Sequence, residues 1–343
     1  MVIAAHIAGK KENYGYLLAA LSGLAAKYPS DRFIIFSANA VHALPENCLQ
    51  VSVLPKPINN LLLYYWYNYK LPSLLIKYNA NAFITDTGML CMKTAIPQYL
   101  YFSNNLFEKG RKTFFKKTFR QGLAKAKTIF TAEDFITDDL SAKYPISAGK
   151  IQTVYHGLPV YPSSVKELPV PESSYYLYPV SGASSAYLLT ILKAFSQLKK
   201  RQKTSMKLVL LLRCMRDSKM IPDLKNYRFR DEVLIMEGDE RTEALIKNAF
   251  GLIWFCNYDD ADVAFGSLKY GVPLIVQENE VNTKLFGNAV MLTYGSENAV
   301  AEKMQLLYKD ENLKNALLQN ARLLLKKYDE DRATDQLRAA IMP

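Results

Sequence analysis

Small residues gather where an apolar segment meets a helical pattern near the middle of the chain. Residues 179–189 read PVSGASSAYLL, with Gly182, Ser184 and Ser185 at the expected turn. Backbone N–H groups at the beginning of a helix, helped by serine hydroxyls, can bind a phosphate group. Small residues equally suit a tight strand-to-helix connection that binds nothing. We expect a phosphate-binding turn here, with the purely structural connection as the alternative.

A second candidate site is a cluster of three aspartates before an apolar segment, Asp259, Asp260 and Asp262. Ionised carboxylates accept hydrogen bonds, for example from hydroxyl groups of a ligand. An aspartate in this place can instead cap the first turn of the next helix. Because a cap uses only one of the three, the cluster predicts ligand binding.

Histidines and cysteines are too few and too scattered for a metal site. The chain has three histidines and four cysteines, and no two cysteines form a CxxC pair. We therefore expect no bound metal, no disulfide framework and a reducing compartment, the cytoplasm. His6 lies at the end of the first apolar segment and is a weak candidate for catalysis. His156, beside Gly157, is expected to be structural.

Length and composition predict a folded protein of two domains. The chain has 343 residues, of which 50% belong to the set AVILMFWYC and 22% are charged, which excludes a disordered or fibrous protein. With 43 basic and 32 acidic residues, the net charge is +11. No apolar run approaches the roughly 18 residues of a membrane-spanning helix, and the apolar N-terminus is too short for a signal peptide. We expect a soluble or peripheral protein.

Prolines mark the expected domain boundary. Five of the fifteen prolines lie within residues 159–179. Proline fixes φ and removes a hydrogen-bond donor, so this stretch suits a linker. We place a first domain at residues 1–158, a linker at 159–174 and a second domain at 175–328. A last helix, about residues 329–343, can pack back onto the first domain.

Short apolar segments alternate with helical patterns on both sides of this boundary. The segments are apolar throughout, which is typical of parallel strands covered on both faces. The sequence therefore predicts two doubly wound, Rossmann-like α/β domains facing a cleft, with ligands bound beyond the carboxyl ends of the strands. The expected strands are residues 2–8, 31–37, 82–85, 98–102, 128–131, 175–180, 207–212, 233–237, 251–255 and 273–277. The expected helices include residues 16–27, 186–201 and 242–248, and residues 299–328 are expected to form one or two closing helices.

Several segments carry a resemblance, in order along the chain. They are NYGYLLAALSGLAAKYPSDRFIIF (13–36), TIFTAEDFITDDLSAKYPISAGKIQTVYHGLP (128–159), VLIMEGDERTEALIKNAFGLIWFCNYDDAD (233–262), KYGVPLIV (269–276) and LFGNAVMLTYGSENAVAEKM (285–304). Together they resemble the retaining GT-B glycosyltransferases of the family-four type (glycosyl transferases group 1). The resemblance implies the GT-B architecture. It also implies an acceptor-side loop at Asn13 and Gly15.

The resemblance implies a reaction as well. Such enzymes transfer a sugar from a nucleotide-diphosphate donor to a saccharide or lipid-linked acceptor, with retention of configuration and without a metal or another cofactor. In this chain the role would be in cell-surface glycan assembly. The departing nucleotide diphosphate develops negative charge, which requires fixed positive charge or oriented N–H groups.

The donor-site residues of that family are replaced in this chain. Ser185 and Ala186 stand where the family has an Arg and a Lys. Gly266 stands at the second of two glutamates, and Lys284 at a further acidic position. Fold alone does not confer activity. A non-catalytic GT-B module that binds glycan, lipid or a partner glycosyltransferase is therefore the alternative function.

The other signature positions also differ. The first glutamate corresponds to Tyr258 or, with a one-residue deletion, to Asp259. Asn104 and Asn105 stand where the family has a His-Asp pair near the acceptor. Asparagines can hydrogen-bond an acceptor but are poor proton acceptors, so they are weak catalytic candidates.

A basic stretch could contact a membrane. It reads KGRKTFFKKTFRQGLAKAK, begins at Lys109, ends at Lys127, and holds eight Lys or Arg and no acidic residue. Such a segment can lie peripherally on the anionic inner face of a membrane. The aromatic LLLYYWYNYK (61–70) could add apolar contacts. A solvated helix with its phenylalanines packed inward is the alternative. No nucleic-acid-binding module is recognised, so we expect no nucleic-acid partner.

Overall fold

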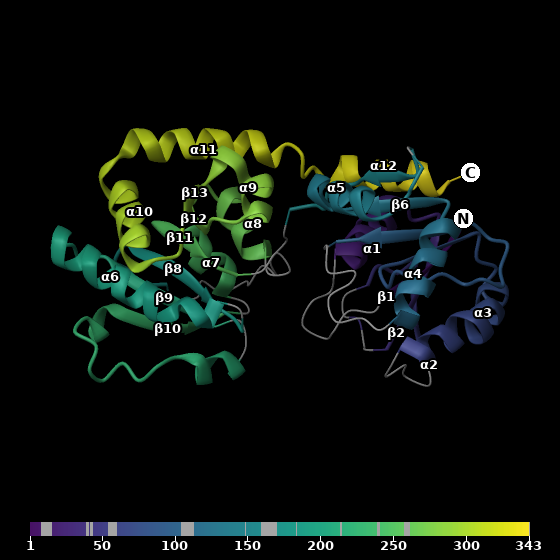
Figure 1. The fold of residues 1–343 in the computed structure, drawn as a ribbon, viewed down its shortest axis with the longest axis horizontal. Coiled ribbons are helices and arrows are strands. Elements are labelled where there is room, and N and C mark those ends of the chain that lie inside the picture. Colours follow the sequence, from purple (N-terminus) through teal and green to yellow (C-terminus); the bar gives the residue numbers. More distant parts are fainter. Residues whose placement is uncertain are drawn as a thin grey trace. The chain divides into compact units, whose positions relative to one another are not determined.

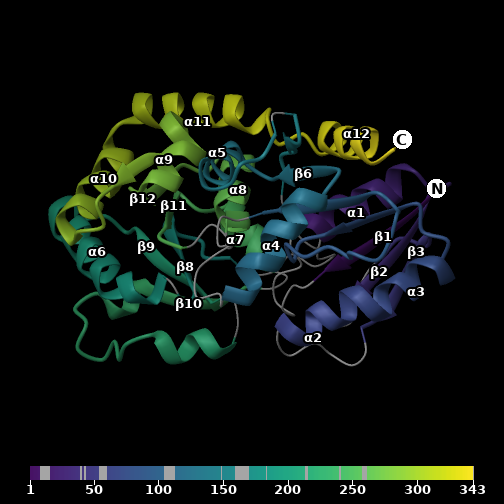
Figure 2. The ribbon, with the colours of Figure 1, turned by 45° about the vertical axis from the view of Figure 1, so that its right-hand side comes forward.

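The structure is a computed structural model, and the chain divides into two units (Figures 1 and 2). The first unit is Met1–Gly157 with Tyr328–Pro343, and the second is Leu158–Lys327. Among the residues described, no helix is both long and apolar enough to cross a membrane. The structure describes residues 1–7, 16–38, 41, 44–53, 60–103, 113–147, 149–158, 170–182, 184–212, 215–238, 241–256 and 261–342.

The first unit is built on a seven-stranded parallel sheet in the order β3-β2-β1-β4-β5-β6-β7. Its inner strands are buried along almost their whole length, as a parallel sheet covered on both faces requires. The strand order reverses between β1 and β4. The strands are β1 (Val2–Ile7), β2 (Arg32–Ser37), β3 (Cys48–Ser52), β4 (Ala82–Thr85), β5 (Gln98–Phe102), β6 (Thr128–Thr131) and β7 (Ile151–Thr153).

One helical segment of the first unit contains a wider turn. The π-helical turn η1 joins α2 to α3, and Figure 2 shows the three as one continuous helix. Pro72, near the start of α3, cannot donate the usual backbone hydrogen bond, and the Leu71 N–H bonds back to the Trp66 carbonyl. The helices of this unit are α1 (Tyr16–Lys27), α2 (Asn60–Tyr65), η1 (Trp66–Lys70), α3 (Leu71–Lys77), α4 (Thr113–Lys125), α5 (Asp134–Lys143) and α12 (Glu330–Ile341).

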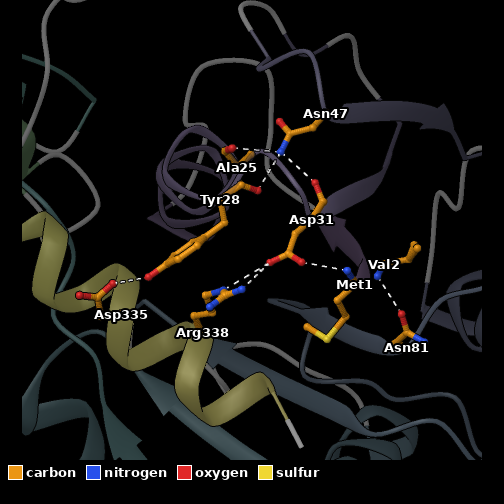
Figure 3. Close-up of polar contacts among 9 residues, drawn as sticks. All are labelled: Met1, Val2, Ala25, Tyr28, Asp31, Asn47, Asn81, Asp335 and Arg338. Carbon is orange, nitrogen blue, oxygen red and sulfur yellow. Dashed lines mark hydrogen bonds and ion pairs between the residues drawn. The ribbon is translucent and has the colours of Figure 1, made fainter.

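The last helix, α12, packs beside α1 in the first unit (Figures 1 and 3). The Tyr28 hydroxyl donates to Asp335 at 2.6 Å, and Lys27 pairs with Asp335 at 2.9 Å. The Arg338 guanidinium lies 3.8 Å from the Tyr28 ring centroid and pairs with buried Asp31 at 3.2 Å. Burial opposes ionisation of Asp31, but the N-terminal ammonium and Arg338 outweigh it and hold the pKa of this carboxyl below its usual value.

The second unit is built on a six-stranded parallel sheet in the order β10-β9-β8-β11-β12-β13. The first strand of this unit, β8, is central, and the order reverses between β8 and β11. This is the doubly wound arrangement. The strands are β8 (Tyr175–Val180), β9 (Lys207–Leu212), β10 (Val233–Glu237), β11 (Gly251–Trp254), β12 (Leu274–Gln277) and β13 (Met291–Thr293).

In the second unit, α6 packs with α10, α10 with α11, and α8 with α7 and α11. Residues 299–328, predicted as one or two closing helices, form two, because Asp310 interrupts them and accepts a hydrogen bond from the Leu313 N–H as the cap of α11. The helices are η2 (Ser184–Tyr187), α6 (Leu188–Gln202), η3 (Met215–Met220), η4 (Arg230–Glu232), α7 (Thr242–Lys247), α8 (Ala261–Lys269), α9 (Glu280–Phe286), η7 (Gly287–Ala289), α10 (Glu297–Lys309) and α11 (Glu311–Leu325).

The two parallel sheets with their helices confirm the predicted class, two doubly wound Rossmann-like α/β units. Most of the predicted linker, residues 159–169, lies outside the described residues.

Candidate functional site

The turn after β8 stands at the point where the strand order of the second unit reverses, which is where doubly wound sheets bind ligands. Ser184 holds this turn together. Its fully buried hydroxyl donates to the Pro179 carbonyl at 2.8 Å and accepts from the Ser181 N–H at 2.8 Å. The Tyr178 hydroxyl donates to the Ser184 carbonyl at 2.7 Å. Ser184 therefore shapes the turn from inside.

The outer side of the same turn is open. Gly182 is exposed, and no atom of the described residues lies within 4 Å of the place where its Cβ would stand. The Ser185 hydroxyl is half-buried and donates to the Gly182 carbonyl at 3.0 Å. Two of the three predicted residues thus face outward at the N-terminal end of η2 and α6, where a helix favours anions.

Two polar side chains that were not predicted lie beside this turn. The Gln277 amide, at the carboxyl end of β12, donates to the Tyr187 hydroxyl at 2.7 Å. The Tyr187 ring meets the edge of Phe255 with centroids 5.3 Å apart. A polar residue ending an apolar strand is the signal that could have identified Gln277.

The acidic cluster is described only in part. Asp262 lies in the first turn of α8, where a negative charge is favourable. Asp259 and Asp260 lie outside the described residues, as does Tyr258. The same holds for the first-domain candidates Asn13, Gly15, Asn104 and Asn105.

The remaining signature positions are placed by the structure. Ala186 is exposed in η2, and Gly266 is buried inside α8. Lys284 lies in the last turn of α9 and pairs with Glu280 at 2.9 Å. Neither Gly266 nor Lys284 supplies the carboxylate that the resemblance implies at these positions.

The corresponding reversal point of the first unit, between β1 and β4, holds a buried polar network. The Tyr67 hydroxyl lies 2.8 Å from His6 Nδ1, 2.8 Å from the Thr85 hydroxyl and 2.7 Å from the Thr87 hydroxyl. Burial lowers the pKa of His6 from its usual 6.5 to about 3, so the imidazole is neutral at neutral pH. His6 is therefore placed at the expected edge but is already bonded to Tyr67.

His156 belongs to a second buried cluster in the first unit. Its Nε2 lies 3.4 Å from a Glu133 carboxylate oxygen, and its ring stacks on Tyr16 with centroids 4.1 Å apart. The Tyr328 hydroxyl donates to the other Glu133 oxygen at 3.0 Å. These contacts give His156 a structural role. Among the described residues, no group of three His, Cys, Asp or Glu side chains is arranged to hold a metal ion.

Comparison with known proteins identifies the fold. No protein-family model and no curated protein sequence matches the chain. Among solved structures, a glycosyltransferase from Rickettsia africae ESF-5 has a TM-score of 0.74 at 13% identity, over 99% of this chain and 97% of that chain. WaaG, a glycosyltransferase involved in lipopolysaccharide biosynthesis, has a TM-score of 0.70 at 13% identity over 100% of both chains. Anabaena Alr3699/HepE, solved in complex with UDP and glucose, has a TM-score of 0.69 at 12% identity over 98% of both chains. The predicted GT-B fold is thereby confirmed.

Proposed function

We propose that this protein is a glycosyltransferase that transfers a sugar from a nucleotide-diphosphate donor to a saccharide or lipid-linked acceptor. The observation that carries the proposal is the open turn at Gly182 and Ser185, at the strand-order reversal of the second unit. Its support from relatives is the fold, together with the UDP and glucose in the HepE structure.

In this proposal the donor pyrophosphate lies against the outer side of the turn. Gly182 lets the phosphates approach the backbone, and the Ser185 hydroxyl turns from the Gly182 carbonyl to the ligand. The N–H groups at the start of η2 and α6 stabilise the departing diphosphate in place of side-chain cations. Asp262, with Asp259 and Asp260, binds sugar hydroxyls. The reaction needs no metal or other cofactor and retains the anomeric configuration.

The acceptor belongs to the first unit, where Asn13, Gly15, Asn104 and Asn105 are its candidate contacts. We assign the protein to cell-surface glycan assembly in the cytoplasm, at the inner face of the membrane. WaaG, which shares the fold, takes part in lipopolysaccharide biosynthesis. Exposed cations on α4 support contact with an anionic surface: Lys116, Lys117 and Arg120.

A non-catalytic GT-B module that binds glycan, lipid or a partner glycosyltransferase is the second candidate. The observation that favours it is the replacement of charged donor-site residues. Ser185, Gly266 and Lys284 leave these positions without the charges that the resemblance implies. Loss of one preorganised donor to a developing anion typically costs about 2.7–4 kcal/mol.

Calorimetric titration with UDP and related nucleotide diphosphates tests the donor site. We expect saturable binding to the wild type. Gly182→Leu, which fills the open space, should lower the affinity at least about tenfold, a loss of about 1.4 kcal/mol. Ala142→Leu, at an exposed position of α5, is the matched control and should bind as the wild type does. Absence of binding to the wild type would contradict the donor site.

Transfer itself is tested with radiolabelled nucleotide sugars and candidate acceptors. Labelled product with the wild type, reduced in Gly182→Leu, supports the transferase. Nucleotide binding without transfer from any common donor would favour the non-catalytic module.

A further inference from the structure

A cavity of about 600 Å³ opens on the first unit, away from the carboxyl edge of its sheet. It lies at the C-terminal ends of α4 and α5, which lead into the beginnings of β6 and β7. Doubly wound sheets bind their main ligands at the opposite edge. The cavity is therefore distinct from the donor and acceptor regions, and a ligand bound in it is independent of the proposed transfer reaction.

The charged residues that line this cavity in the described part of the chain are all basic. Of the nine described residues that line it, three are Lys or Arg and none is acidic. They are Arg120 from α4, Lys143 from the end of α5, and Lys150 before β7. A neighbouring hollow of about 470 Å³ shares Arg120 and adds Lys116 and Lys117. The surface around the cavity thus extends the same positive charge along α4.

Two of these cations have partners within the protein, and the third has none among the described residues. The Lys150 ammonium donates to the Ala124 carbonyl at 2.7 Å, and Lys143 pairs with Asp139 at 2.8 Å. Such contacts are ordinary for lysines near helix C-termini. Arg120 lies in the middle of α4 and makes no hydrogen bond or ion pair within the part of the chain that the structure describes. Its guanidinium is available to a ligand.

The remaining lining of the cavity is largely apolar. Leu123 and Tyr144 are buried beneath it, and Pro145 and Ile146 form a wall beside the cations. Ligand sites usually have this composition, with an apolar surface and a few polar groups that fix orientation, and volumes of roughly 300–1,000 Å³. The space is larger than an inorganic ion needs.

We propose that this cavity binds a phosphate monoester carried on an apolar body. A phosphate monoester has a charge of about −1.5 to −2 at pH 7 and three acceptor oxygens, which suit a lining that contains Arg120, Lys143 and Lys150. The planar Arg120 fork can bind two phosphate oxygens at once. The apolar body lies against Tyr144 and Ile146.

Two sources could supply such a ligand, a lipid headgroup or a soluble phosphorylated metabolite. The first test uses dihexanoyl phosphatidate below its micelle concentration, titrated calorimetrically into the full chain. We expect saturable binding with one ligand per chain. Arg120→Gln should lower this affinity about 10- to 100-fold, since a hydrogen bond to a charged group contributes about 1.5–3 kcal/mol.

Lys127→Gln is the matched control, because Lys127 is exposed beyond the end of α4, does not line the cavity, and changes the net charge equally. It should alter the affinity less than about twofold, as expected for a screened surface charge. Ile146→Ser should weaken phosphatidate binding and leave the weak binding of inorganic phosphate unchanged. All three changes are at incompletely buried positions, and overlapping thermal melts would confirm that the variants fold.

Vesicle flotation separates the two sources. If phosphatidylcholine vesicles containing phosphatidate carry the wild type and Lys127→Gln but not Arg120→Gln, the ligand is a lipid headgroup. If hexyl phosphate binds as tightly as the phosphatidate and the vesicles carry none of the proteins, the ligand is soluble. The proposal is overturned if phosphatidate does not bind saturably, or if Arg120→Gln and Lys127→Gln weaken binding equally.

Discussion

The two sheets reverse their strand order at equivalent points, but the residues there are used differently. In the first unit, the Tyr67 hydroxyl contacts His6, Thr85 and Thr87 in a network that is buried throughout. In the second unit, Ser184 stabilises the turn from inside, while Ser185 is only half-buried and the missing Cβ of Gly182 has no described atom within 4 Å. The first point is closed by its own side chains, whereas the second is left open by the residues that the structure describes.

The first of these points therefore contributes to the stability of the fold, whereas the second is available for binding a ligand. Buried polar groups must find partners inside the protein, and a complete network is costly to disturb. An open turn can change its outward residues at little cost to folding, so those positions are free to serve a ligand. Substitutions at the first point should therefore lower the free energy of unfolding, and outward substitutions at the second should lower the affinity for a ligand.

The largest expected effect is at Tyr67. Tyr67→Phe removes the hydroxyl that joins the three other members of the network. His6 Nδ1 then loses this buried partner, whereas the Thr85 and Thr87 hydroxyls still contact each other at 3.1 Å. We expect the free energy of unfolding in urea to fall by about 3 kcal/mol. Tyr69→Phe, at a side chain that is 54% exposed, is the control and should change it by less than about 0.5 kcal/mol. Equal effects would contradict the special role of the network.

The second largest effect is expected from acid, which should lower the free energy of unfolding through His6 in the buried network of the first unit. The pKa of His6 is about 3 in the folded protein and about 6.5 when unfolded, so between these values only the unfolded chain binds the proton. Stability from this group is therefore present above pH 6.5 and is lost as pH falls toward 3. Between pH 7 and 5 the free energy of unfolding should drop by about 2 kcal/mol on account of His6.

The measurement is urea unfolding at both pH values for the wild type and for His6→Asn. The variant should lack this part of the pH dependence. If both proteins lose the same stability, another group is responsible.

The smallest expected effects come from two adjacent serines that receive the same change. Ser184→Ala removes a buried hydroxyl with two backbone partners and should cost about 1–2 kcal/mol in urea unfolding. Ser185→Ala should cost less than about 0.5 kcal/mol. In a UDP titration, Ser185→Ala should lower the affinity severalfold, because the Ser185 hydroxyl is the one proposed to contact the ligand. A greater stability loss at Ser185 would show that the inward and outward assignments are reversed.

The fold was largely predictable because its inner strands are short runs of apolar residues. The segments that form β2 and β9 need burial on both faces, which only a covered parallel sheet provides. Strand β3 was not predicted, because its residues are all partly exposed at the sheet edge and show no continuous apolar run. The π-helical turn at Trp66–Lys70 was not predicted either, because its longer hydrogen bond depends on Pro72 and the packing around it.

The turn of the candidate site was predictable in position but not in detail. Small residues after a strand identified the turn at Gly182, yet nothing in the sequence distinguishes the inward Ser184 from the outward Ser185. That distinction depends on the backbone path after Pro179. The polar network of the first unit could not be predicted from the sequence, for a different reason. His6 and Tyr67 are 61 residues apart, and only the folded sheet and helix bring them together.

The helix α12 has a consequence for how the protein is made. Its Thr334, Leu337 and Ile341 are buried in the first unit, although the whole second unit, Leu158–Lys327, is translated in between. The second unit is one uninterrupted piece of chain, so its packing needs no segment that is translated later. The first unit keeps the apolar surface that α12 covers exposed until α12 has been synthesised. During synthesis, the half that begins first is completed last.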